Sequence, residues 1–93
     1  MNLTFEWNKS KAKDNFAKHG VSFELAKRVF DDPFAIEVVD DGHDYDEERF
    51  VIIGMVEGRI LYVVYAERKG VIRLISARSA NRHEQEGYLE ENP

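Results

Sequence analysis

The side chains of this sequence that are best suited to chemistry are its arginines. Arg68 follows Glu67 at the end of a strand-like run, and Arg78 lies between a second such run and a helix-forming segment. Arginine stays charged and binds phosphate oxygens with a fixed geometry. The unpaired N–H groups at the start of a helix also attract anions. The position of Arg78 therefore favours an anion-binding role, although a structural salt bridge would explain it equally well.

Three more residues are candidates to assist these arginines. Arg73 lies in the middle of a strand-like run, where it either binds an anion or spans an open sheet face. Regular alternation would place Arg73 and Arg78 on opposite faces of that strand. Lys18 and His19 close the first helix-forming segment, and His19 is able to transfer protons near neutral pH. A terminal histidine also complements the helix dipole, so a purely structural role is the alternative.

The motifs of the commonest enzymes are missing from the sequence. It contains no cysteine, which excludes a thiolate nucleophile, thiolate zinc sites and disulfides. The motifs GxxxxGK[ST], GxGxxG, HExxH and GxSxG are also absent. His43 lies in an acidic segment that could hold a divalent cation, but the segment does not match a calcium loop. We therefore expect no metal and no cofactor, and either metal-independent acid–base chemistry or no chemistry.

The charges are segregated along the chain. The formal net charge is −5, from 18 acidic and 13 basic residues. Residues 1–30 and 49–83 carry excesses of three and five positive charges. Residues 31–48 contain nine acidic residues and residues 84–93 contain four, with no basic residue in either segment. An acidic total normally argues against nucleic-acid binding, but this arrangement allows a basic face. Solvated surface is the simpler explanation of the acidic runs.

Three predicted helices position the candidate residues. Asn8 caps a helix over residues 9–19, and Gly20 ends it. Ser22 caps a second helix, which ends before Pro33 because proline disfavours helical backbone in the residue that precedes it. Ser79 is predicted to cap a last helix over residues 80–90.

Five strand-like runs complete the pattern. They cover residues 3–7, 34–39, 49–56, 59–66 and 71–77. Short turns at residues 57–58 and 68–70 require the last three strands to pair antiparallel. The order strand-helix-helix-four strands-helix predicts one small α+β domain over residues 1–93, with a mainly antiparallel sheet and the helices packed on one face. The sequence shows no signal peptide and no apolar run of membrane-spanning length, so we expect a cytoplasmic protein without membrane contact.

Short fragments spread along the chain form an ordered pattern. They are Phe5-Glu6-Trp7, Lys11-Ala12, Lys18-His19-Gly20-Val21-Ser22-Phe23-Glu24, Val29-Phe30, Asp32-Pro33, Glu48-Arg49-Phe50, Glu67-Arg68, Ile72-Arg73-Leu74-Ile75-Ser76-Ala77-Arg78, Glu84 and Tyr88. In this order and spacing they resemble the BrnT family of type II toxins, small ribonucleases similar in fold to the RelE toxins. The resemblance extends over nearly the whole chain.

The resemblance implies a toxin that cleaves RNA, inhibits translation and is neutralised by a BrnA-like antitoxin. Such an antitoxin is encoded nearby and carries a ribbon-helix-helix domain, so the toxin would meet DNA only through it. Cleavage of RNA without a metal uses the 2′-hydroxyl as nucleophile, and it needs a base, an acid and cations for the phosphate oxygens. The available proton carriers are Glu67, Tyr65 and His19.

On this hypothesis the candidate site contains two groups of residues. Catalysis is assigned to His19, Glu67, Arg68 and Arg78, and RNA phosphate binding to Lys18 and Arg73. The alternative is a catalytically silent binding module that holds a basic protein partner through the acidic segment around His43 and the acidic C-terminal tail, since opposite charges steer association.

Overall fold

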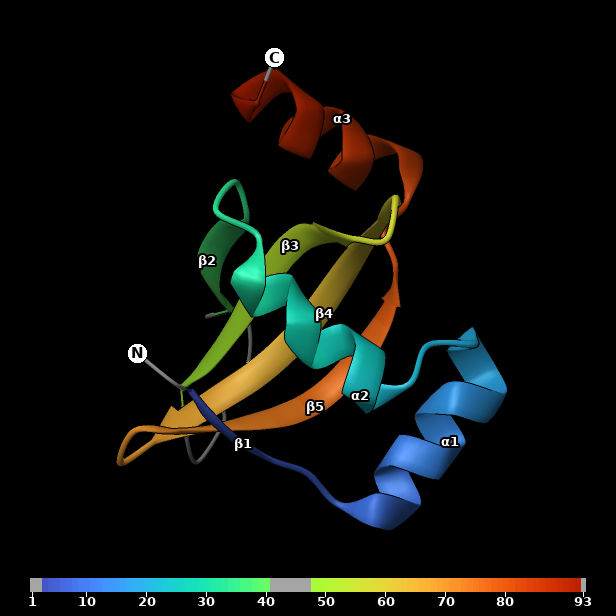
Figure 1. Ribbon diagram of the computed structural model, residues 1–93, viewed down its shortest axis with the longest axis vertical. Helices are drawn as coiled ribbons and strands as arrows, with labels where there is room; N and C mark the ends of the chain where they lie inside the picture. Colours follow the sequence, from blue (N-terminus) through green and yellow to red (C-terminus); the bar gives the residue numbers. More distant parts are fainter. Residues whose placement is uncertain (1–2, 41–47, 93) are drawn as a thin grey trace.

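A five-stranded sheet forms the centre of the molecule (Figure 1). The computed structural model describes residues 3–40 and 48–92. Its elements are β1 (Thr4–Glu6), α1 (Lys9–His19), α2 (Phe23–Ala26), the 3₁₀ helix η1 (Lys27–Asp31), β2 (Ile36–Asp40), β3 (Arg49–Val56), β4 (Arg59–Arg68), β5 (Val71–Ser79) and α3 (Arg82–Glu91). The strand order is β1-β5-β4-β3-β2, and within these residues only β1 and β5 pair in parallel. The predicted α+β class with a mainly antiparallel sheet is confirmed.

Two tight turns join the last three strands. Glu57 and Gly58 connect β3 to β4, and Lys69 and Gly70 connect β4 to β5. Their φ angles are positive, at 50°, 78°, 52° and 80°. Positive φ at both central residues is typical of type I′ turns, whose twist matches that of the flanking strands. Arg68, predicted within the second turn, is instead the last residue of β4.

The caps of the first two helices agree with the sequence pattern. Asn8 accepts a hydrogen bond from the Lys11 N–H at 3.0 Å, and Gly20 ends α1 in the left-handed conformation with a φ of 68°. Ser22 caps α2 in the same way. These predictions are confirmed. The second helix, however, changes to 3₁₀ geometry after its first turn and continues as η1 to Asp31.

The last helix begins later than predicted. Ser79, the expected cap, still belongs to β5, where it pairs with Leu61. Asn81 caps α3 instead. Its side chain accepts a hydrogen bond from the Glu84 N–H and the Glu84 carboxylate accepts one from the Asn81 N–H, both at 2.8 Å. The prediction of Ser79 is wrong because this reciprocal capping box satisfies two backbone donors, whereas a serine alone satisfies one.

The hydrophobic core lies between the sheet and the segment formed by α2 and η1, which crosses one sheet face (Figure 1). Phe23, Ala26 and Val29 of that segment are buried against apolar residues of the central strands. Gly54 of β3 permits the close approach of η1, because a Cβ atom at this position would lie 2.6 Å from Val29 Cγ2.

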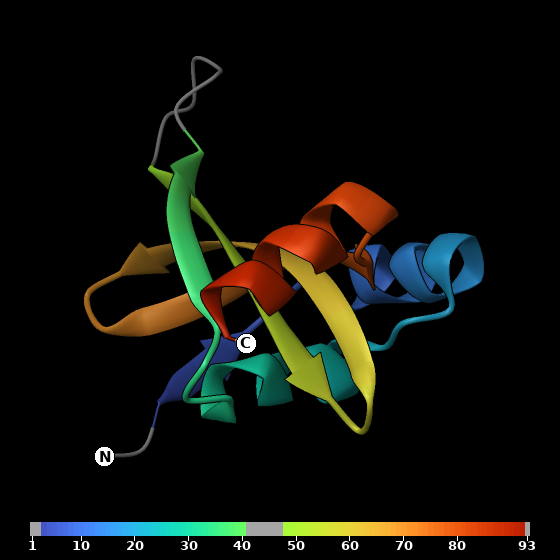
Figure 2. The same cartoon turned by 90° about the horizontal axis from the view of Figure 1, so that it is seen from above.

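The two longer helices lie at the margins of the sheet (Figures 1 and 2). The buried Asn15 of α1 bonds to the backbone of Ala77 in β5, accepting from its N–H at 3.1 Å and donating to its carbonyl at 2.8 Å. α3 lies beyond the end of the sheet that carries the β3–β4 turn, and Tyr88 ties it to Asp32. None of the described helices is long and apolar enough to span a membrane.

Candidate functional site

A β-bulge in β5 brings Arg73 and Arg78 onto one face of the sheet. The register between β4 and β5 shifts by one residue at Ile75, which is left without a partner in this ladder. Arg73 consequently lies opposite Ala66 and Arg78 opposite Tyr62, two β4 residues that share a face. The prediction that the two arginines lie on opposite faces is therefore wrong. We call the face that carries them the arginine face.

Arg78 is tied to the start of α3. Its guanidinium donates to both carboxylate oxygens of Glu84, at 2.8 and 2.9 Å, and to the Ser79 carbonyl at 3.2 Å. It also lies over the Tyr62 ring, 4.0 Å from the ring centre. The hydrogen bonds to Arg78 hold the pKa of Glu84 below its ordinary value, although burial opposes this shift. The Arg78 side chain keeps 35% of its surface exposed, so part of the guanidinium remains accessible.

Lys18 and His19 line a hollow between α1 and β5, which we call the α1 hollow. Its volume is about 230 Å³, and its lining residues are Lys11, Asp14, Asn15, Lys18, His19, Ile75 and Ser76. The charged groups of this lining are therefore mostly basic, with two lysines and a histidine against the single carboxylate of Asp14. Ser76 lies two residues before Arg78 on the same strand and the same face, about 7 Å along the backbone. The bulge at Ile75 thus lies at the junction of this hollow and the arginine face.

Arg68 and Arg73 come together in a second hollow, near the β4–β5 turn. This turn hollow has a volume of about 190 Å³ and is lined by Glu6, Ala66, Arg68, Lys69, Val71 and Arg73. Arg68 lies six residues along β4 from Tyr62, the partner of Arg78, which corresponds to a backbone separation of about 20 Å. The predicted basic residues therefore divide into two groups, and Arg68 and Arg78 do not meet at a single phosphate.

The two other proton carriers lie on the opposite face. Glu67 pairs with Ile72 at the end of β4. Tyr65 is buried in the core beside Phe50, and its hydroxyl donates to Glu37 Oε1 at 3.0 Å. Burial and the neighbouring Glu37 carboxylate raise the pKa of Tyr65. His19, in contrast, lines the α1 hollow together with Lys11 and Lys18. His43 lies outside the described residues.

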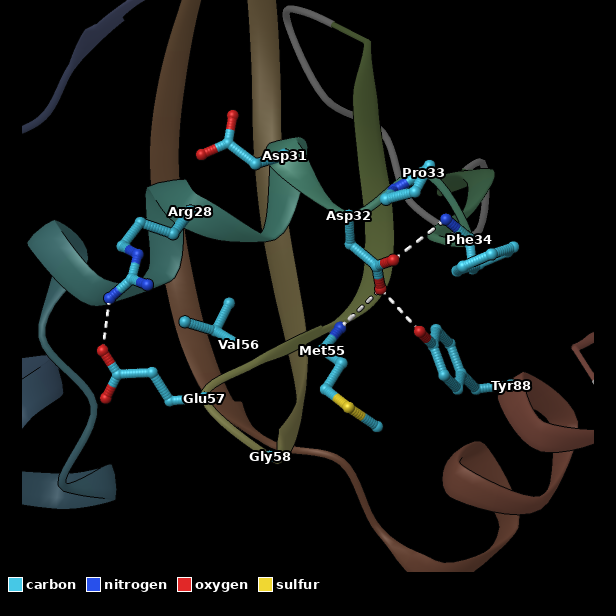
Figure 3. A pocket seen from close by; sticks show the side chains of 10 residues that line it. All are labelled: Arg28, Asp31, Asp32, Pro33, Phe34, Met55, Val56, Glu57, Gly58 and Tyr88. Atoms are coloured by element: carbon cyan, nitrogen blue, oxygen red, sulfur yellow. Dashed lines mark hydrogen bonds and ion pairs between the residues drawn. The ribbon is translucent and has the colours of Figure 1, made fainter.

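The largest of the three hollows lies where η1, the β3–β4 turn and α3 meet (Figure 3). Its volume is about 420 Å³. Asp32 lies at its centre, where the carboxylate accepts hydrogen bonds from the Tyr88 hydroxyl at 2.6 Å, the Met55 N–H at 2.8 Å and the Phe34 N–H at 2.9 Å. Arg28 and Glu57 form an ion pair on its wall. All oxygens of Asp32 are therefore engaged in holding the fold together.

Sequence reasoning missed several residues of these sites. Lys11 and Ser76 line the α1 hollow, Tyr62 supports Arg78, and Glu84 holds it. The spacing of Lys11 and Lys18, seven residues or two helical turns apart, would have placed both on one helix face. No sequence pattern shows the bulge, because Ile75 continues a regular apolar run.

A comparison with known families gives a match over most of the chain. Residues 7–84 match the family described as "Ribonuclease toxin, BrnT, of type II toxin-antitoxin system". The protein is thus of the class of type II toxins, whose partner is an antitoxin. Because the match covers most of the sequence, the chain belongs to the BrnT family of ribonuclease toxins. A comparison with curated proteins gives no significant match.

Proposed function

We propose that this toxin is an endoribonuclease that cleaves RNA without a metal ion. A base removes the proton of a 2′-hydroxyl, and the 2′-oxygen forms a bond to the adjacent phosphorus. The bond between phosphorus and the 5′-oxygen breaks, and an acid gives that oxygen its proton. The products carry a 2′,3′-cyclic phosphate and a 5′-hydroxyl. Cations stabilise the charge that develops on the equatorial oxygens.

The α1 hollow and the arginine face supply side chains for these steps. His19 takes the proton of the 2′-hydroxyl and gives it to the 5′-oxygen as the bond to phosphorus breaks, since an imidazole can act as base and then as acid. Arg78 holds the reacting phosphate, and Lys18 assists it. Arg68 and Arg73, in the turn hollow, bind a phosphate further along the RNA chain. Glu67 was the second candidate for proton transfer, but it lies on the other face of the sheet.

One observation carries the proposal more than any other. His19 lines a hollow with Lys11 and Lys18, and Ser76 of the same hollow lies two residues before Arg78 on the same face of β5. A proton carrier that shares a hollow with two lysines, close along the strand to an arginine, supplies groups suited to phosphate chemistry without a metal. The excess positive charge of residues 1–30 and 49–83, which contain α1, β4 and β5, supports RNA as the substrate.

The same proposal specifies the partner and the effect on the cell. The antitoxin is a BrnA-like protein with a ribbon-helix-helix domain, and the toxin meets DNA only through it. Cleavage of RNA in the cytoplasm inhibits translation. A cell that expresses this chain without the antitoxin gene should therefore stop growing and lose full-length transcripts.

Purified protein incubated with RNA in EDTA tests the catalytic assignment. We expect cleavage by the wild type and a loss of about a hundredfold or more in His19→Asn and Arg78→Ala. His83→Asn and Arg82→Ala are the matched controls, because both residues are exposed on α3, and they should cleave like the wild type. Equal activity in all five proteins would refute the site.

A second candidate function is a catalytically silent module that only binds a partner. The acidic charge of residues 31–48 and 84–93 favours it. The RNA assay separates the two functions, because a silent module leaves RNA intact at every protein concentration and still binds the antitoxin.

A further inference from the structure

The exposed large apolar side chains of the described residues are concentrated around β2. Seven such side chains are exposed. Val38 and Val39 lie on β2, Phe34 precedes it, Met55 lies on the neighbouring β3, and Leu89 lies on α3. Phe34 and Met55 line the largest of the three hollows, together with Tyr88 of α3 (Figure 3). Leu89 is the next residue after Tyr88. Exposed apolar side chains that gather at one edge of a sheet often mark a surface that binds another protein.

β2 is also an open edge of the sheet. In the described part of the chain it pairs only with β3. Val38 and Val39 point to opposite faces because they are successive residues of a strand, yet their exposed fractions are 52% and 50%. The outer side of β2 is therefore uncovered on both faces. Its backbone N–H and C=O groups can pair with another strand.

The other edge of the sheet is protected. β1 consists of only three residues and covers β5 only from Val71 to Arg73. Further along β5, the side chain of Asn15 occupies both backbone groups of Ala77. The contrast between the two edges indicates that the open edge at β2 is there for a partner.

The charge around β2 specifies the chemistry of that partner. The described residues 31–40, which contain β2, include four acidic residues and no basic one. Glu37 and Asp40 lie on β2 itself. The nearby cations lie beside carboxylates: Arg28 pairs with Glu57, and Arg49 lies opposite Asp40 in the strand register. A basic segment with alternating apolar residues fits this surface.

We propose that the antitoxin adds an extended segment to the outer edge of β2. Backbone hydrogen bonds provide affinity, apolar residues of the segment contact Val38, Val39 and Phe34, and its lysines or arginines face Glu37 and Asp40. Val38 and Asp40 share a sheet face with Arg73 and Arg78, but β3 and β4 lie between this edge and the strand that carries the two arginines. The proposal rests on the antitoxin partner of the proposed function and is independent of whether the toxin cleaves RNA.

Binding of the purified full-length chain to the antitoxin encoded beside it tests the proposal. The double variant Val38→Lys/Val39→Lys places positive charge on the edge, and we expect at least a tenfold loss of affinity. The control Leu3→Lys/Phe16→Lys changes the two exposed apolar residues remote from β2 and should bind like the wild type. Thermal melting should leave all three proteins folded, since each substituted side chain is about half exposed. Equal affinity of the β2 variant and the wild type overturns the proposal.

Hydrogen exchange distinguishes strand addition from a side-chain contact. In the free toxin, alternate amides of β2 face outward and should exchange rapidly. We expect the antitoxin to protect these amides, and contact through side chains alone would leave them fast. Protection that appears on raising the concentration of the toxin alone would identify a second copy as the occupant and overturn the antitoxin proposal. RNA is absent from both experiments, so neither outcome depends on catalysis.

Discussion

Arg78 and Glu84 join the end of β5 to the first turn of α3 through two hydrogen bonds, at 2.8 and 2.9 Å. The same carboxylate accepts the Asn81 N–H, so one glutamate both caps the helix and holds the arginine. Glu84 is largely buried, with 15% of its side chain exposed, while Arg78 is more accessible. The guanidinium proposed to bind phosphate is thus held in place before RNA arrives.

The ion pair allows the catalytic and structural roles of Arg78 to be separated. Arg78→Ala and Glu84→Gln both break it, and each should lower the free energy of unfolding by about 1–3 kcal/mol. Only Arg78→Ala removes the cation, which should slow RNA cleavage about a hundred- to a thousandfold. Urea unfolding and cleavage rates measured on both variants check this. Equal loss of cleavage in the two variants would assign Arg78 a structural role alone.

Acid should weaken the attachment of α3. The folded state holds the pKa of Glu84 below its unfolded value, so this carboxylate contributes stability at neutral pH that is lost as the pH falls below the ordinary range of glutamate. Glu84→Gln should therefore unfold with a shallower dependence on pH below about 5 than the wild type. If urea unfolding gave the same dependence of the free energy of unfolding on pH for Glu84→Gln and the wild type, this would contradict the role of the Glu84 carboxylate.

The hydrogen bond between Tyr88 and Asp32 should make the stability of the fold depend on pH in the alkaline range. Burial, together with the hydrogen bond to Asp32, raises the pKa of Tyr88 to about 12. A raised pKa contributes stability that is complete below about pH 10 and is lost as the pH rises through 12. Tyr88→Phe should lower the free energy of unfolding by about 1.5–3 kcal/mol at pH 7, and the difference from the wild type should shrink above pH 10. Tyr62→Phe is the control and should change little. A difference that stays constant up to pH 12 would exclude this hydrogen bond as the source.

Alanine substitutions at two glycines test two different effects, close packing at Gly54 and helix propensity at Gly87. Gly54→Ala forces a Cβ atom against Val29 and should cost about 1–3 kcal/mol. Gly87 lies inside α3 with open space around its Cα, and Gly87→Ala should stabilise the chain by about 0.5–1 kcal/mol. Thermal melting of the two variants should therefore shift in opposite directions. A stable Gly54→Ala variant would show that η1 moves away from β3.

RNA binding should depend on salt because counterions are released from phosphates. Fluorescence anisotropy with a 2′-O-methyl RNA, which lacks the nucleophile, measures affinity without cleavage. Lys18→Ala should reduce the slope of log affinity against log salt by about one relative to the wild type. Lys27→Ala is the control, since Lys27 pairs with Glu24 on α2. An affinity that is unchanged between low and physiological salt would exclude phosphate contacts.

The secondary structure was predictable because its signals are local. Caps such as Asn8 and Ser22 act on the next turn of the chain, and alternation identifies strands without knowledge of their partners. The residues of the capping box, Asn81 and Glu84, were also visible in the sequence, but Ser79 was an equally plausible cap. The pairing of Ser79 with Leu61, which keeps this serine in β5, could not be seen from the local sequence.

The arrangement of the site was less predictable because it depends on one register shift. Ile75 carries no sign of a bulge, yet that single extra residue decides that Arg73 and Arg78 share a face. The separation of Arg68 from Arg78 follows from the length of β4, whose end was predicted two residues too early. Tyr65 and Glu67 lie an odd number of residues from Tyr62, the partner of Arg78, and therefore point to the opposite face of the sheet.

The chemical nature of the RNA ends produced by the purified toxin tests the central claim most directly. RNA is incubated with the wild type in EDTA, and the fragments are examined for their terminal groups. We predict cleavage with 2′,3′-cyclic phosphate and 5′-hydroxyl ends, and a loss of about a hundredfold or more in His19→Asn. Intact RNA, or fragments with 5′-phosphate ends that form only when a divalent metal is supplied, would contradict the mechanism.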